Sequence, residues 1–137
     1  MQAIQATLTP EDTVSLRIRQ GIVVANLISL VDSAHDEGAI AYWVEATRGA
    51  KRGAPDEFGH RNWYQFEVFV DDLWYLISVN TIIAGIERVL NGDTQVNDAI
   101  RRSIAQDVAE GLGYGYIDDE ALDVIIQVGL FGEIVYG

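Results

Sequence analysis

Residues 62–71, Asn-Trp-Tyr-Gln-Phe-Glu-Val-Phe-Val-Asp, contain the clearest alternation in the chain. The even positions from Tyr64 to Val70 are all aromatic or β-branched, whereas the odd positions include Gln65 and Glu67 beside two aromatic residues. Aromatic and β-branched side chains at a period of two are typical of a strand that is buried on one face. The stretch therefore predicts a strand with the even positions facing a core.

A second alternating stretch precedes the first. Residues 39–47 predict a strand whose one face carries Ile40, Tyr42, Val44 and Ala46. The two strands would form a long β-hairpin joined by residues 48–61, Arg-Gly-Ala-Lys-Arg-Gly-Ala-Pro-Asp-Glu-Phe-Gly-His-Arg. A connection of this length is not a tight turn, which indicates a role beyond reversing the chain.

The connecting loop differs in charge from the rest of the chain. The 137 residues carry a formal charge of −12, from 9 basic and 21 acidic residues. Four of the basic residues fall within positions 48–61: Arg48, Lys51, Arg52 and Arg61. With Asp56 and Glu57 the loop has a net charge of +2, so the remainder carries −14. A positive loop on a negative body favours association with further copies of the chain or with another acidic partner.

Three helices are predicted around the hairpin. The first begins at Thr9-Pro10 and fades over residues 32–38, where Gly38 can reverse the chain. The second begins at Asp71-Asp72 and ends at Asn91-Gly92. The third is capped by Thr94 and stopped by Gly111 and Gly113.

The last quarter of the sequence allows two interpretations. Residues 114–117 and 124–131 are rich in β-branched residues and glycine, which favours two strands joined by an acidic turn. Alternatively, residues 118–120, Asp-Asp-Glu, begin a short helix. Either way, we expect a single α+β domain over residues 1–137, with a mainly antiparallel sheet, a long β-hairpin and helices packed on one face.

Composition excludes several classes of protein. An apolar fraction of 49% and a charged fraction of 22% are typical of a packed globular domain, and the absence of cysteine excludes disulfides and thiolate chemistry. No signal peptide or membrane span is apparent, so we expect a soluble protein that binds no membrane. The sequence pI near 4.3 argues against direct nucleic-acid binding.

Residues that could carry chemistry are few. His35 and His60 each lie near carboxylates but lack the spacing of metal ligands, so we expect both to be exposed on loops. The acidic groups 71–72 and 118–120 are explained as caps or turns, and the glycines of 111–115 lack the context of a phosphate loop. We therefore expect no enzyme, no cofactor and no metal.

The three tryptophans each neighbour a tyrosine, in the pairs 42–43, 63–64 and 74–75. One member of each pair would enter the core, and the other could anchor an interface, because Trp, Tyr and Arg dominate binding hot spots. The residues predicted to form an assembly interface are Arg48, Lys51, Arg52, Arg61, Trp43 and Trp63.

In length and element order the chain resembles the tail-terminator or tail-completion (neck) proteins of tailed bacteriophages. The resemblance rests on residues 39–70 and on residues 114–120 with the apolar run that follows, about half of the chain; the long third helix departs from it. It implies a non-enzymatic virion protein, made in the host cytoplasm, that forms a homo-oligomeric ring, usually a hexamer, between tail-tube and neck proteins. The alternative is an acidic inhibitor or immunity protein that neutralises a basic partner by charge mimicry, and a small hydrolase is the third possibility.

Overall fold

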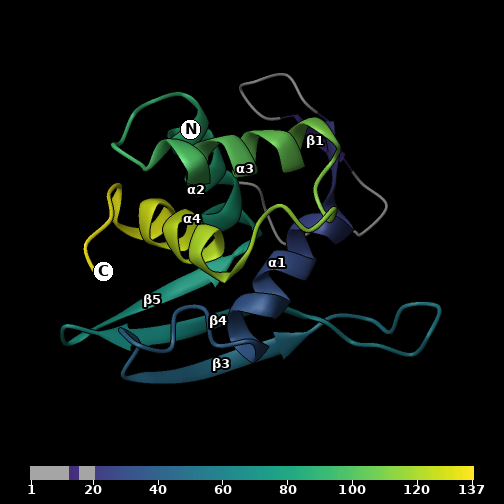
Figure 1. The fold of residues 1–137 in the computed structure, drawn as a ribbon. Helices are drawn as coiled ribbons and strands as arrows, with labels where there is room; N and C mark the ends of the chain where they lie inside the picture. The colour runs from purple at the N-terminus through teal and green to yellow at the C-terminus, as the bar shows by residue number, and fades with distance from the viewer. Residues whose placement is uncertain (1–12, 16–20) are drawn as a thin grey trace.

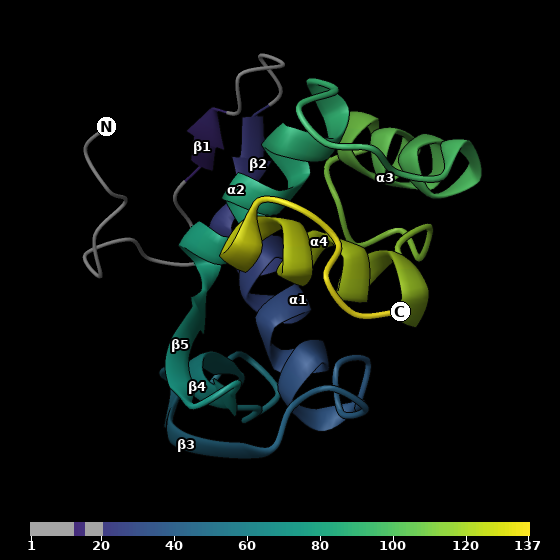
Figure 2. The same cartoon turned by 90° about the vertical axis from the view of Figure 1, so that its left-hand side faces the viewer.

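The computed structural model describes residues 13–15 and 21–137 and has an α+β architecture, as the sequence predicts. A three-stranded antiparallel sheet contains β3 (Ala46–Arg52), β4 (Trp63–Val70) and β5 (Leu73–Ser78), in the order β3-β4-β5. The described helices are α1 (Val24–Asp36), α2 (Val79–Leu90), α3 (Asp98–Ala109) and α4 (Asp119–Phe131). Figures 1 and 2 both place the helices on one side of this sheet.

The strand predicted over residues 62–71 is confirmed and lies at the centre of the sheet. Its even positions Phe66, Val68 and Val70 are buried against the helices, while Tyr64 is half-buried. The apolar side of β4 therefore faces the core, as its alternation predicts.

The predicted first helix is wrong over its first part. Residues Thr9 to Asp12 lie outside the described residues, but β1 (Thr13–Ser15) and β2 (Gly21–Val23) pair as antiparallel strands. Helix α1 begins only at Val24, because the β-branched run before it enters a strand pairing that helical spacing does not reveal. At its other end, Gly38 has a φ of +77° and reverses the chain as expected.

The strand predicted over residues 39–47 is also misplaced. Residues 39–43 form turns, in which the amides of Trp43 and Val44 both donate to the carbonyl of Ile40. The strand β3 instead covers residues 46–52, so the first five residues of the predicted loop are strand. Pairing with β4 satisfies the backbone hydrogen-bonding groups of this polar segment. The composition of the segment alone does not predict a strand.

Asp71-Asp72 forms a tight turn and not a helix cap. Both residues have positive φ, 49° and 63°, which joins β4 directly to β5 in a two-residue hairpin. Helix α2 begins later, at Val79, after a capping box between Ser78 and Thr81. Its end at Asn91-Gly92 agrees with the prediction, with Gly92 at a φ of +74°.

The remaining two helices begin differently from the favoured predictions. Helix α3 is capped by Asn97, whose side chain accepts from two backbone amides, and not by Thr94. Its end at the glycines 111 and 113, both with positive φ, agrees with the prediction. Helix α4 is capped by Asp118, so the favoured strand interpretation of residues 124–131 is wrong and the helical alternative is correct. Every residue from Ala121 to Val128 is buried, which removes the amphipathic period that identifies a surface helix.

Helices α2 and α4 approach each other closely at two glycines. A Cβ atom on Gly85 would lie 2.0 Å from the carbonyl oxygen of Ile125, and one on Gly129 would lie 2.2 Å from that of Thr81. Because each glycine meets backbone and not a side-chain end, the two helices touch main chain to main chain. The crossing holds α4 in the core, where the buried apolar residues of the described chain form one cluster.

Candidate interaction surface

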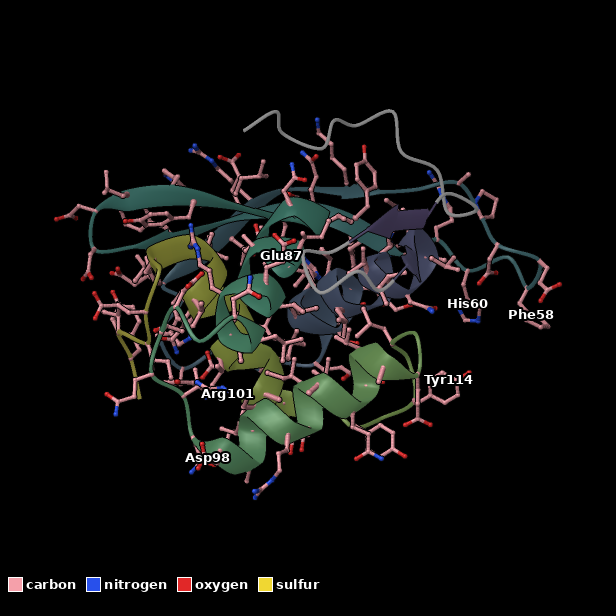
Figure 3. The ribbon with its side chains drawn as sticks, turned by 90° about the horizontal axis from the view of Figure 1, so that it is seen from above. Phe58, His60, Glu87, Asp98, Arg101 and Tyr114 are labelled. Carbon is pink, nitrogen blue, oxygen red and sulfur yellow. The ribbon has the colours of Figure 1, made fainter. Side chains whose placement is uncertain are left out.

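Residues 48–61, which we call the basic arm, consist of the end of β3 and the loop that leads to β4. In Figure 1 this loop projects from one end of the sheet, beyond the helical layer. Figure 3 shows its tip, where Phe58 and His60 point away from the body. The position makes the arm accessible to a partner.

The tip of the arm is held by hydrogen bonds. One oxygen of Asp56, Oδ1, accepts from the backbone amides of Phe58 and His60, each at 2.9 Å. The amide of Asp56 donates to the carbonyl of His60 at 2.8 Å, and the amide of Gly53 donates to the carbonyl of Asn62 at 3.0 Å. A carboxylate that bonds amides two and four residues ahead fixes a turn, so the tip has a defined shape before any partner arrives.

The cations of the arm are held in different ways. The Arg52 guanidinium lies 4.3 Å from the centroid of the Trp63 ring, and Arg61 Nε donates to the carbonyl of Gly53 at 3.1 Å. The Lys51 side chain is exposed, and its ammonium group makes no hydrogen bond or ion pair with any residue from 13–15 or 21–137. The arm thus combines fixed guanidinium groups with one solvated ammonium group.

Arg48 belongs to the outer face of the sheet. Its guanidinium lies 3.8 Å from the centroid of Trp74, and its Nε lies 3.4 Å from Glu67 Oε1. The Arg48 side chain is about half exposed (54%), so this exposed pair contributes little to stability. The contacts orient the charge. Arg48 lies on the sheet face, whereas the other three cations lie at the base of the loop.

The strand that carries the arm is an edge strand with a bulge. Arg48 pairs with Glu67 and Lys51 with Gln65, so residues 49 and 50 face a single residue of β4. Gly49 has a φ of +64°, as expected for this type of bulge. Charged side chains and bulges discourage uncontrolled pairing of sheet edges, which favours recognition through side chains over strand addition.

Of the predicted interface residues, Trp43 does not join the others. It is buried, its Nε1 donates to Asp123 Oδ1 at 2.8 Å, and its ring stacks on Tyr136 with 5.4 Å between centroids. Its neighbour Tyr42 is the exposed member of the pair. Trp43 is therefore a core residue, and we remove it from the interface.

Trp63 stays beside the arm. Its ring lies 4.6 Å from the His35 ring and 4.3 Å from the Arg52 guanidinium, and its amide donates to Asp32. It is half-buried and supports the arm from the side of α1.

A groove of about 500 Å³ lies between the first turns of α4, the turn after α1 and the C-terminal segment 132–137. Its lining residues are Gly38, Ala39, Tyr42, Ile100, Asp119, Glu120, Asp123, Val124, Gln127, Ile134, Tyr136 and Gly137. Asp119 and Glu120 are exposed at its rim, and no Lys, Arg or His is among the lining residues. The groove is therefore acidic with apolar walls.

A network of polar side chains, buried except for Tyr42, forms the floor of the groove. Asp123 Oδ1 accepts from Trp43 and from Gln127 Nε2, and Asp123 Oδ2 accepts from the Tyr42 hydroxyl at 2.5 Å. Gln127 Oε1 in turn accepts from the amides of Val135 and Tyr136, which fixes the C-terminal segment. Since each polar atom of this set has a partner, the network positions chain segments.

Two tyrosine hydroxyls beside the groove have raised pKa values. Burial of the hydroxyl, followed by its hydrogen bond to Asp123, raises the pKa of Tyr42 to about 12. The hydrogen bond to Asp71 raises the pKa of Tyr136 to about 12. Both groups are therefore protonated donors at neutral pH.

The histidines are placed differently from each other. His35 lies in the last turn of α1, with its ring against Trp63 and Phe66, so the expectation that it is exposed on a loop is wrong. Helix α1 ends at Asp36, within the segment where we expected it to fade. His60 is exposed on the arm, as expected. Within the described ranges, no group of three or more His, Asp or Glu residues could hold a metal ion.

The glycine-rich segment after α3 has a structural explanation. Asp107 is 2% exposed, and its two oxygens accept from the amides of Tyr114 and Ile117 at 3.0 and 3.2 Å. Asn26 Nδ2 donates to the carbonyl of Gly111 at 3.0 Å. These contacts secure the turns of the segment. The burial of Asp107 has no signal in the sequence, because this residue occurs between polar and apolar residues of an amphipathic helix.

Comparisons with protein-family models, with curated proteins and with solved structures found no match to this chain. In the described residues, no helix is both long and apolar enough to span a membrane.

Proposed function

We propose that the chain is a non-enzymatic structural subunit that assembles with further copies of itself through the basic arm. The observation that carries the proposal is the arm itself: an ordered, projecting loop with net positive charge on a chain of charge −12. The resemblance to tail-terminator and neck proteins supports a ring in a phage virion that meets tail-tube and neck proteins.

Physical considerations support this class of function. Head-to-tail assembly requires two different and complementary surfaces on each subunit, and a positive arm with an acidic body supplies both. An ordered loop loses less conformational entropy on binding than a flexible one does. Arginine is suited to such contacts, since its planar group pairs with carboxylates in a fixed geometry.

Solution size tests the proposal. Mass photometry and light scattering at low salt should reveal oligomers of discrete size, and these should dissociate as salt screens the charges. The double variant Lys51→Glu, Arg52→Glu should remain monomeric with an unchanged circular dichroism spectrum. Arg102→Glu, a charge reversal at an exposed position on α3, is the matched control and should assemble normally.

The contrary results are also specific. A wild-type chain that stays monomeric at every concentration and salt tested, with or without a tail-tube protein, would overturn the proposal. One-to-one capture of a basic protein by such a monomer would instead favour the inhibitor or immunity function, for which the acidity of the body is the supporting feature.

A further inference from the structure

Phe58 is the most exposed large apolar residue of the described chain. Its side chain is 78% exposed at the apex of the arm, and Asp56 fixes the backbone on both sides of it. Leaving an aromatic ring in water forgoes burial worth roughly 25 cal/mol per Å² of apolar surface. A rigid turn that presents such a ring on an arm with several cations is suited to anchoring a protein interface.

The groove beside α4 has the complementary properties. Its apolar walls come from Ala39, Ile100, Val124 and Ile134, and its rim carries Asp119 and Glu120. With about 500 Å³ of space it can accept an aromatic ring, and its lack of cations leaves the rim charges available to the partner's cations.

We propose that Phe58 of one copy inserts into the groove of a second copy, with Lys51 and Arg52 near the Asp119 and Glu120 rim. This inference rests on the proposed self-assembly and specifies its two contact surfaces. The occupant is the arm of another copy because the arm and groove match in charge and in polarity: an apolar tip with a positive base meets an apolar cleft with a negative rim.

The positions of the two surfaces exclude an intramolecular contact. In Figure 1 the arm leaves one end of the molecule, and the C-terminal segment that lines the groove lies at the opposite end. A copy therefore cannot insert its own arm. The contact is heterologous and leaves a free arm and a free groove on each pair, so that association continues until a ring closes or a filament forms.

Phe58→Ala tests the anchor. It should weaken self-association roughly tenfold or more, as truncation of an interface hot spot does. Tyr114→Ala is the matched control, because Tyr114 is an aromatic residue 65% exposed that lies in neither surface, and its hydrogen bond to Asp107 uses only the backbone. Dissociation constants from sedimentation velocity give the comparison, with thermal unfolding to check that each variant is folded.

Charge exchange tests the rim. Asp119→Lys with Glu120→Lys should weaken association, and so should Lys51→Glu with Arg52→Glu. Combining all four substitutions in one chain should restore self-association at least in part. Mixing a Phe58→Ala chain with the rim-reversed chain leaves one functional arm facing one functional groove, so the mixture should form discrete heterodimers and no larger species.

The outcomes separate the two proposals. If wild-type chains do not associate, the self-assembly proposal fails and this inference fails with it. If they associate but Phe58→Ala and the rim variants have wild-type dissociation constants, assembly stands and the arm-in-groove contact is refuted. Restored association in the four-substitution chain supports the contact, and continued loss in a folded four-substitution chain argues against it.

Discussion

The crossing of α2 and α4 leads to a prediction about stability that uses no assumption about function. Gly85 and Gly129 lie inside helices with ordinary backbone angles, where exchange to alanine normally favours the helix by about 1 kcal/mol. Here each new methyl group would meet the backbone of the opposite helix. We predict that Gly85→Ala and Gly129→Ala both destabilise the protein strongly.

The magnitude follows from the distances. For Gly85 the methyl would lie 2.0 Å from a carbonyl oxygen, whereas ordinary contact begins at 3.4 Å, so the helices must separate by about 1.4 Å at this point. Such a separation opens the buried contacts around Ile82, Ile86 and Ile125. Overpacking typically costs about 1–3 kcal/mol and occasionally more. Because rigid backbone is displaced, we expect a cost at the upper end of this range or above it, leaving a net loss of about 2–3 kcal/mol after the helix gain.

Urea denaturation followed by circular dichroism measures the effect as a shift in midpoint at constant slope. The matched control is Gly53→Ala, because a Cβ there would meet nothing closer than 3.8 Å and the residue does not require positive φ. We expect the control to change the free energy of unfolding by less than about 1 kcal/mol in either direction. A Gly85→Ala protein as stable as the wild type would refute the close crossing of α2 and α4.

Three further predictions concern buried or ordered polar groups. Asp107→Ala should lower the free energy of unfolding, measured by urea denaturation, by about 1–3 kcal/mol, because it removes the acceptors of two loop amides. Alanine at the exposed Asp98 should lower it by less than about 1 kcal/mol. Equal effects would contradict the buried role of Asp107. The folded state holds the Tyr42 proton more tightly than the unfolded state does, because the pKa of Tyr42 is raised from 10.0 to about 12. The stabilisation that comes from the protonated Tyr42 hydroxyl is therefore complete below pH 10 and is lost as the pH rises through about 12. Tyr42→Phe should therefore flatten the decline of stability over that interval, and an unchanged slope would argue against the hydrogen bond to Asp123. Asp56→Ala should accelerate hydrogen exchange of the Phe58 and His60 amides, which donate to the Asp56 carboxylate, and should leave overall stability nearly unchanged. Unaltered exchange would show that the carboxylate does not hold the tip.

The sequence predicted those elements whose local pattern and tertiary role agree. The strand around Phe66 alternates because one face is buried and the other is not, and the ends at Gly38, Gly92 and Gly111 follow from backbone angles that glycine adopts readily. The charge contrast of the arm is likewise a property of the sequence alone. The α+β class and the helices packed on one face follow from these features.

Other features depend on contacts between distant segments. Residues 73–78 satisfy helical spacing, yet the turn at Asp71-Asp72 pairs them with β4, and the sheet determines their conformation. Residues 119–131 have a strand-like composition but form a helix, because α4 is enclosed by other elements and needs no polar face. The groove, with Asp123 and Gln127 at its floor, joins three separate parts of the chain and has no local signal in the sequence. Amino-acid pattern thus determined the apolar faces, the chain reversals and the charged arm, whereas tertiary packing determined which segments pair and where the groove forms.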